Sequence, residues 1–263
     1  MIELDAVSVA VPASASSPAT SPGAEPGSAR RRWGRADHGT PGEITILHPT
    51  TLSLTERSVA VIGANGSGKS TLARLLNGLV LPTRGYVRVH GLDTHDDGRA
   101  VRRMVGFVFS DAEAQLVMPT PREDVALSVR RTGVERSLRA ERVEEVLGSV
   151  GLAHLADVSV HALSGGQKQL LALAGVLATE PRVLVCDEPT TLLDLRWRTH
   201  VTALLGRLEQ QVVHVTHDLD AALLADRVLV VDHGRVVADG APEASVAAYR
   251  ELMATRVGTT DEP

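Results

Sequence analysis

Residues 63–70, with the sequence GANGSGKS, have the residue types and the spacing of a loop that binds phosphate groups. The glycines would let backbone N–H groups converge on phosphate oxygens, because no side chain stands in the way. Lys69 would add a mobile cation for the β- and γ-phosphates of ATP, and the Ser70 hydroxyl would serve Mg²⁺. The residues predicted to bind ATP are Gly63, Ala64, Asn65, Gly66, Ser67, Gly68, Lys69, Ser70 and Thr71.

Two adjacent acids, Asp187 and Glu188, follow the apolar run of residues 183–186. In an open α/β sheet, an acid at the carboxyl end of a strand lies beside the ligand crevice. Asp187 would hold Mg²⁺ together with Ser70, directly or through water, and Glu188 would orient or deprotonate the attacking water. Such a pair alone indicates only a solvated turn, but beside a phosphate loop it indicates ATP hydrolysis.

The elements that must position these residues follow from apolar periodicity. Residues 58–62 form a short buried strand that leads into the loop, and residues 69–79 place four leucines on one helical face. That helix would direct the positive end of its dipole at the phosphates. Further strands are expected at residues 2–11, 44–54, 183–186, 212–215 and 228–231, and helices at 139–155 and from Pro242 onward. Strands separated by helical segments predict a largely parallel sheet.

Three further segments occur in an order typical of one family. Residues 163–169 (LSGGQKQ) resemble the signature motif of the ATP-binding cassette (ABC) ATPases and stand just before the strand that ends in acids. Residues 190–194 resemble the D-loop of that family and end at Asp194, and residues 213–218 resemble its switch-histidine segment around His217. The chain is therefore identified as a member of this family over nearly its whole length.

The resemblance implies an α/β fold of the phosphate-loop ATPase type. We expect one ABC ATPase domain over residues 1–263, with a mostly parallel sheet core and an antiparallel β subdomain. A helical subdomain would be inserted at residues 110–163, and a C-terminal helix and tail would occupy residues 242–263, with the helix packed against the core.

The resemblance also implies a head-to-tail dimer with a second ABC ATPase subunit, either identical or different. Each ATP would lie between the phosphate loop of one subunit and the signature of the other, where a helix N-terminus offers a second anion site. Glu188 and His217 are then the expected catalytic residues; the alternative for His217 is a strand-end histidine bonded to backbone. The signature residues expected to act on the partner's ATP are Leu163, Ser164, Gly165, Gly166 and Gln167.

Three features depart from the family pattern. Ser110 occupies the place of a glutamine that reaches Mg²⁺ and the water, and a bridging water or the nearby Gln115 is expected to replace that contact. Val11 stands where the family stacks an aromatic residue on adenine; Trp33 could substitute, or could be an ordinary loop residue. Residues 12–42, rich in Pro, Ala, Ser and Gly, are expected to form a flexible surface insertion.

Residues 115–126, like the phosphate-loop and signature regions, are similar to the ATPases of energy-coupling-factor (ECF) importers, and among these to biotin-type subunits. The resemblance implies ATP-driven import of a small vitamin, biotin first, through a transmembrane coupling protein and a membrane substrate-binding component. The ATPase of a cobalt, nickel or conventional ABC importer is the alternative. A soluble ABC ATPase that acts on DNA or ribosomes is a more remote one.

The composition of the chain limits which of these functions are possible. The chain has 263 residues and a net charge of -5, and this acidic balance argues against a nucleic-acid partner. Cys186 is the single cysteine, so no internal disulfide forms. Because no apolar run approaches the length of a membrane span, we expect a peripheral subunit at the cytoplasmic face of the cell membrane. The histidines show no metal-ligand spacing, and His214 and His217 should lie on opposite faces of one strand.

Overall fold

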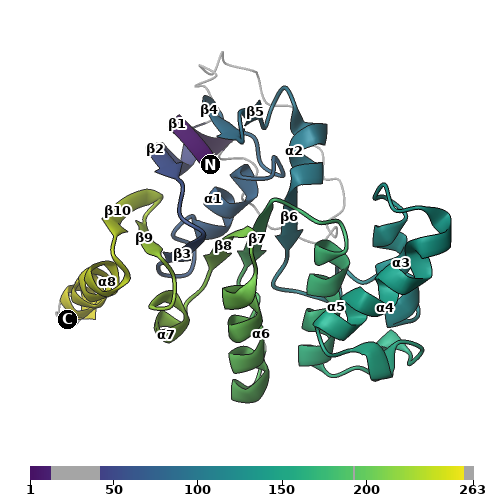
Figure 1. The fold of residues 1–263 in the computed structure, drawn as a ribbon. Helices are drawn as coiled ribbons and strands as arrows, with labels where there is room; N and C mark the ends of the chain where they lie inside the picture. Colours follow the sequence, from purple (N-terminus) through teal and green to yellow (C-terminus); the bar gives the residue numbers. More distant parts are fainter. Residues whose placement is uncertain (13–41, 192, 258–263) are drawn as a thin grey trace, which may run out of the picture.

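The computed structural model describes residues 1–12, 42–191 and 193–257, so that most of the expected insertion, including Trp33, lies outside the described residues. Figure 1 shows two sheets next to each other, with a group of helices (α3, α4 and α5) at one side of the central sheet and α8 at the other. The fold therefore has a sheet core flanked by separate helical and β parts.

Six strands form the central sheet in the order β10-β9-β3-β8-β7-β6. All neighbouring pairs from β9 to β6 are parallel, and β10 pairs antiparallel with β9. The strands are β3 (Ser58–Ile62), β6 (Val105–Val108), β7 (Val183–Asp187), β8 (Gln211–Val215), β9 (Arg227–Asp232) and β10 (Arg235–Gly240). The apolar runs of the five parallel strands are buried because helices or the second sheet cover both faces. The parallel strands bring their carboxyl ends, and the loops that follow, to one edge of the sheet.

Four strands form the second sheet, antiparallel and in the order β2-β1-β4-β5. They are β1 (Ile2–Pro12), β2 (Glu43–Leu54), β4 (Arg84–Val89) and β5 (Leu92–Asp93). The sheets meet where the backbone N–H of His48 donates to the carbonyl of Gly234, at 2.8 Å. The predicted α/β class, with a mostly parallel core and an antiparallel β part, is confirmed.

The helices bury their apolar faces in three clusters. Helix α1 (Lys69–Leu75) packs between the two sheets, with α2 (Gly98–Met104) beside it. Helices α3 (Pro121–Val129), α4 (Arg139–Ser149), α5 (Gly165–Leu177) and α6 (Leu195–Arg207) share a second cluster on β6 and β7. Helices α7 (Leu219–Ala222) and α8 (Pro242–Val257) form a third with β3 and β9. Val246 of α8 is 1% exposed, so this helix packs on the sheet as expected.

Two helices are shorter than their sequence pattern indicates. Helix α1 ends at Leu75, and not at residue 79, because Gly78 takes a left-handed conformation and the N–H of Leu79 turns back to the carbonyl of Arg74. Helix α4 ends at Ser149, and not at residue 155, because Gly151 is also left-handed. In both places a glycine ends the helix although the apolar period continues beyond it.

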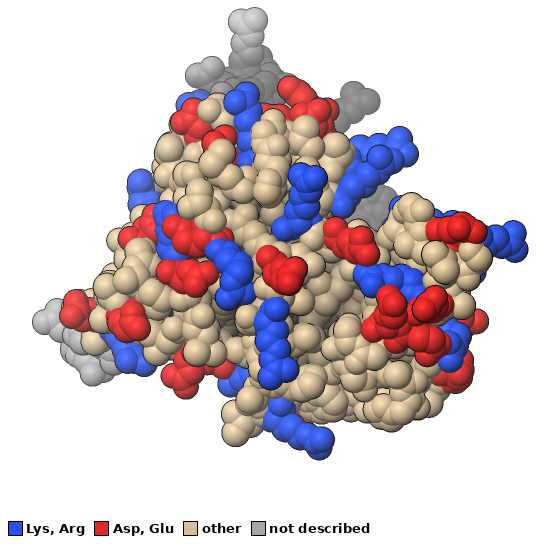
Figure 2. All heavy atoms as spheres, in the orientation of Figure 1, with Lys and Arg blue, Asp and Glu red and all other residues tan. Residues whose placement is uncertain are grey.

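Charged side chains of both signs are interspersed over the face in Figure 2, with no large area of one sign. Many form ion pairs: Arg122 with Asp157 at 2.7 Å, and Arg142 with Glu180 at 2.8 Å. These pairs are largely exposed, so solvent screening leaves them little effect on stability. Apolar burial therefore dominates the stability of the helical part.

Close packing of α5 on β6 requires a glycine. A Cβ at Gly106 would lie 2.4 Å from Cγ1 of Val176, so Gly106→Ala should lower the free energy of unfolding by about 1–3 kcal/mol in urea denaturation. Gly148→Ala is the control, since nothing lies within 4 Å of a Cβ there and α4 should gain about 0.5–1 kcal/mol. Equal effects of the two changes would contradict the packing described.

Candidate nucleotide site

The phosphate loop leaves β3 and turns into α1 through three glycines with positive φ angles, Gly63, Gly66 and Gly68. A Cβ at Gly63 would lie 2.0 Å from the carbonyl oxygen of Val231, so this position admits only glycine. The buried ammonium of Lys69 donates to the carbonyls of Gly63 at 3.0 Å and Ala64 at 2.9 Å. Burial lowers the pKa of Lys69, and the charges of Glu188 and Asp187 oppose this shift. The loop thus holds a cation beside the backbone N–H groups of its glycine-rich turn.

The acid at the end of β7 reaches the first turn of α1. The Ser70 hydroxyl donates to Oδ1 of Asp187 at 2.8 Å, and Nη2 of Arg74 lies 3.5 Å from Oδ2 of the same carboxylate. Asp187 is 4% exposed, while the side chain of Arg74 is 45% exposed. Arg74 is not among the site residues predicted from the sequence, although its place one helical turn after Ser70 could have indicated it.

Glu188 follows in a left-handed conformation, with φ of 53°. Its N–H donates to the carbonyl of Val215 at 3.0 Å, and its Oε2 accepts a hydrogen bond from the Thr191 hydroxyl at 2.8 Å. Nδ1 of His217 lies 3.5 Å from the same Oε2. The non-glycine left-handed backbone costs on the order of 1 kcal/mol, and it aims the carboxylate away from the line of β7.

One open cavity of about 510 Å³, which we call the phosphate hollow, is lined by Lys69, Ser70, Arg74, Asp187 and Glu188 among others. Its lining residues are Ile46, Asn65, Gly66, Gly68, Lys69, Ser70, Thr71, Arg74, Ser110, Asp187 and Glu188. The loop after β3 and the loop after β7 thus meet at one edge of the sheet, as the strand order requires.

Ser110 lines the phosphate hollow, but Gln115 does not. The Gln115 side chain is bound to the backbone of β6 and its extension: Oε1 accepts from the N–H of Phe109 at 3.2 Å, and Nε2 donates to the carbonyl of Phe107 at 3.1 Å. The expectation that Gln115 replaces the missing glutamine is therefore wrong, and a bridging water at Ser110 stays a prediction.

The adenine end of the site has no aromatic residue among the described residues that line the phosphate hollow. Val11 pairs with Ile44 across β1 and β2, and Ile46 of β2 reaches the lining. At this edge of the hollow, the described residues would therefore contact adenine with an aliphatic side chain, that of Ile46.

The signature forms the start of α5 and does not line the phosphate hollow of its own chain. The Ser164 hydroxyl accepts from the N–H of Gln167 at 3.3 Å, and the Gln167 side chain accepts from the N–H of Ser164 at 2.8 Å, which is a capping box. Ser164 and Gly165 are exposed, whereas Leu163 is buried. The Asp194 side chain caps α6 by accepting from the N–H of Trp197 at 2.9 Å.

The fold and the phosphate hollow together define a phosphate-loop ATPase of the α/β class. A family profile described as ABC transporter matches residues 47–191, more than half of the chain. The chain belongs to the ABC transporter family.

Two relatives and one solved structure sharpen the comparison. The chain is 43% identical over 213 residues to "Biotin transport ATP-binding protein BioM" of Rhizobium etli, covering 81% of this chain and 95% of the relative. It is 47% identical over 189 residues to "Energy-coupling factor transporter ATP-binding protein EcfA1" of Halalkalibacterium halodurans, covering 70% and 68%. The dimeric ATP-binding cassette MJ0796 in a post-hydrolysis state with ADP and Pi matches with a TM-score of 0.72 and 28% identity, over 92% of this chain and 99% of that one. This chain is thus the ATP-binding subunit of an ABC-type transporter and resembles ECF subunits; its ATP hydrolysis is coupled to transport.

Two further observations concern metals and membranes. Within residues 1–12, 42–191 and 193–257, no group of three or more His, Cys, Asp and Glu side chains is placed to hold a metal ion. None of the helices that the structure describes combines the length and the hydropathy needed to cross a bilayer.

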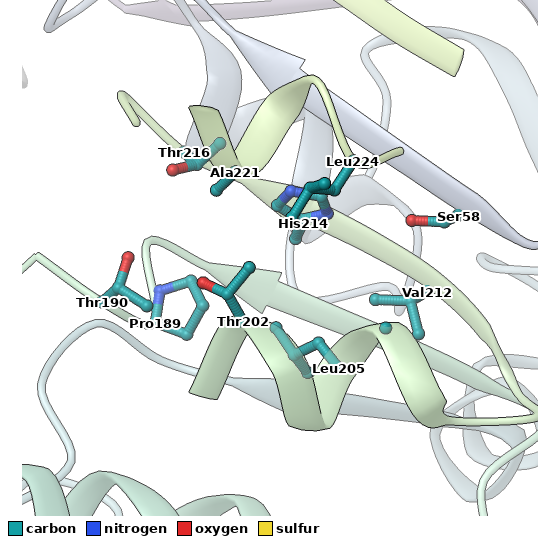
Figure 3. Close-up of a pocket in the computed structure, with 11 residues that line it drawn as sticks. Ser58, Pro189, Thr190, Thr202, Leu205, Val212, His214, Thr216, Ala221 and Leu224 are labelled. Atoms are coloured by element: carbon teal, nitrogen blue, oxygen red, sulfur yellow. The ribbon is translucent and has the colours of Figure 1, made fainter. Parts of the chain in front are cut away.

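Neither His214 nor His217 lines the phosphate hollow, but His217 lies beside Glu188, which does, whereas His214 lines a separate cavity. It lies at the floor of a small cavity between α6 and α7, beside Thr216 and Val212 (Figure 3). His214 is 9% exposed, whereas the side chain of His217 is 48% exposed. Burial lowers the pKa of His214 to about 4, against the opposing effects of a hydrogen bond to the Ala221 backbone and the charge of Asp218.

This burial makes stability depend on pH. The ring is neutral in the folded chain down to about pH 4, whereas in the unfolded chain it protonates near pH 6.5. The free energy of unfolding should therefore have its highest value above about pH 6.5, as far as His214 is concerned. It should fall by about 3 kcal/mol as pH drops toward 4. Urea denaturation across this range should give a smaller loss in His214→Met. His161→Asn, an exposed control, should follow the parent; a parental slope in His214→Met would refute the assignment.

Proposed function

We propose that this subunit powers the import of a small vitamin, with biotin as the first candidate, from the cytoplasmic face of the membrane. The observation that carries the ATPase part is the convergence of Lys69, Ser70, Asp187 and Glu188 on one hollow. The substrate part is supported by the 43% identity to a subunit named for biotin transport. Nothing in the phosphate hollow itself would recognise a vitamin, so membrane partners must do so.

The residues at the hollow fit Mg²⁺. Neighbouring oxygen ligands of octahedral Mg²⁺ lie about 2.9 Å apart, since each is about 2.1 Å from the ion. The Ser70 hydroxyl and the Asp187 carboxylate oxygen are 2.8 Å apart, so both could be ligands, or Asp187 could act through water. When bound with ATP, Mg²⁺ would neutralise charge on the β- and γ-phosphates.

The residues around the bound ATP would then have separate roles. Lys69 would exchange its loop carbonyls for phosphate oxygens, since the ammonium is already held beside the loop. Glu188 would accept the proton of the attacking water at a carboxylate oxygen, with Thr191 fixing its rotamer. His217, beside Glu188 and half-exposed, would donate to the γ-phosphate.

The second subunit is proposed to be a second copy of this chain. The chain carries both halves of a site, the phosphate loop with Glu188 and the exposed signature at Ser164, yet they do not meet within one subunit. Two copies related by a two-fold axis would complete two identical sites. The N-terminus of α5 would then direct its free N–H groups at the partner's γ-phosphate, with Asp194 at the same interface.

The membrane partner is proposed to dock in a groove between α3, α5 and β6. This groove has a volume of about 380 Å³, and its lining includes Arg102, Gln115, Val117 and Asp124. Val117 is 68% exposed, and the buried Asp124 holds its loop by accepting from the N–H groups of Val117 at 3.0 Å and Met118 at 3.1 Å. An exposed apolar side chain on a fixed loop suits the apolar face of a helix.

Glu188→Gln should lower the rate of phosphate release from ATP by about a hundredfold or more, because the amide cannot accept the proton. Binding of ADP, followed by calorimetry, should remain at the parental level. Glu209→Gln, at an exposed position outside the site, is the matched control and should be fully active. Parental activity in Glu188→Gln would show that another group is the base.

A detergent pull-down of the tagged chain from its native membranes tests the transport assignment. We expect a multi-helix transmembrane protein and a compact membrane protein that carries bound biotin. Val117→Glu should lose both, whereas Val237→Glu, a change at an exposed residue of β10, should retain them. Recovery of soluble partners alone would contradict the proposal, and a different bound ligand would correct the substrate.

A further inference from the structure

The first turn of α6 touches the signature of the same chain through Trp197. A Cβ at Gly166 would lie 2.2 Å from Cγ of Trp197, 2.4 Å from Cδ2 and 2.6 Å from Cδ1. The indole ring therefore fills the space that any side chain at Gly166 would need. At the neighbouring Gly165, a Cβ would meet nothing within 4 Å.

The backbone of the same residue is bound to the D-loop. The N–H of Trp197 donates to Oδ1 of Asp194 at 2.9 Å, and the N–H of Arg198 donates to the carbonyl of Asp194 at 2.9 Å. Because one residue contacts both sides, the D-loop cap and the signature glycine are held at a fixed separation.

The next residue extends this connection to the switch-histidine segment. Nη1 of Arg198 lies 3.5 Å from Oδ2 of Asp218, the residue that follows His217. The other carboxylate oxygen of Asp218 caps α7 by accepting from the N–H groups of Asp220 at 3.0 Å and Ala221 at 3.1 Å. Residues 194–198 thus connect the signature, the D-loop and the histidine segment.

We propose that Trp197 is a positioning residue that makes the signature and the D-loop of one subunit move as one body toward the partner's ATP. This inference rests on the proposed dimer, in which both segments act across the interface. Gly166 is then required because the indole ring occupies the space that a side chain there would need. Replacing the ring by a small side chain would leave the chain's own phosphate loop intact but would let the signature shift relative to Asp194.

One side of the Trp197 ring faces solvent. Trp197 is only partly buried, with the Arg196 guanidinium 5.8 Å and the His200 ring 6.0 Å from its centroid. The ring also packs against the second apolar cluster, so Trp197 lies between the signature glycine and the core of the helical part.

Thermal unfolding of a double-mutant cycle tests the contact independently of ATP. Ala normally stabilises a helix relative to Gly, yet Gly166→Ala should lower Tm by about 2–4 °C because of the clash. In the Trp197→Ala background the same change should leave Tm unchanged or raise it. Gly165→Ala, the matched control, should give the same shift in both backgrounds. A Gly166→Ala shift that does not depend on Trp197 would overturn the contact.

ATP-driven association of two subunits tests the proposed role of Trp197. In the Glu188→Gln background, Trp197→Ala should weaken dimer formation with ATP by about tenfold in sedimentation velocity experiments. ADP affinity of the monomer should stay unchanged, and Trp197→Phe should restore most of the association. Equal dimerisation of Trp197→Ala and its parent would overturn the role of Trp197. If the Glu188→Gln parent itself stayed monomeric, the proposed dimer would be wrong, while the thermal cycle would still report on the contact.

Discussion

The hydrogen bond between Ser70 and Asp187 joins residues that are 117 positions apart, and the geometry of the site depends on it. It is possible because β3 and β7 both neighbour β8 and end at the same edge of the sheet. Two backbone bonds continue the pairing beyond the strands, from Thr216 to the carbonyl of Val61 at 3.0 Å and from Glu188 to the carbonyl of Val215 at 3.0 Å. The sheet itself therefore places the phosphate loop, the acids and the switch histidine side by side at the carboxyl ends of neighbouring strands.

The sequence alone predicts this placement well, because its chemistry restricts which residues can stand there. Gly63 approaches the backbone of Val231 too closely for any side chain, and acids at the end of a buried strand indicate ligand binding once a phosphate loop is present in the same chain. The ends of α1 and α4 could not be predicted from apolar period, since Gly78 and Gly151 end these helices while the period continues. The contacts of Arg74 with Asp187 and of Trp197 with Gly166 also escaped prediction. Both join segments distant in sequence, and only Arg74, one helical turn after Ser70, stands where a local pattern could have indicated it.

The same arrangement explains why one chain cannot complete its own site. The signature lies at the start of α5, which packs on β6 and α3 in the second cluster, and so it does not line the phosphate hollow. The helix N-terminus at Ser164 and Gly165 is exposed to solvent, and the first N–H groups of a helix have no partners within the helix. A nucleotide bound between two subunits would satisfy these groups and join the subunits, and its hydrolysis would release them. In the proposed function, opening and closing of the dimer would apply force to a membrane partner docked in the α3 groove.

Complementation between two inactive variants tests the shared site most directly. Lys69→Met disables the phosphate loop and Ser164→Arg disables the signature, so each variant alone should show almost no ATPase activity. A mixed dimer would contain one site with both defects and one intact site. An equal mixture should therefore recover up to about a quarter of the parental rate, since half of the dimers would be mixed and each would have one working site. A mixture no more active than its components would contradict the account.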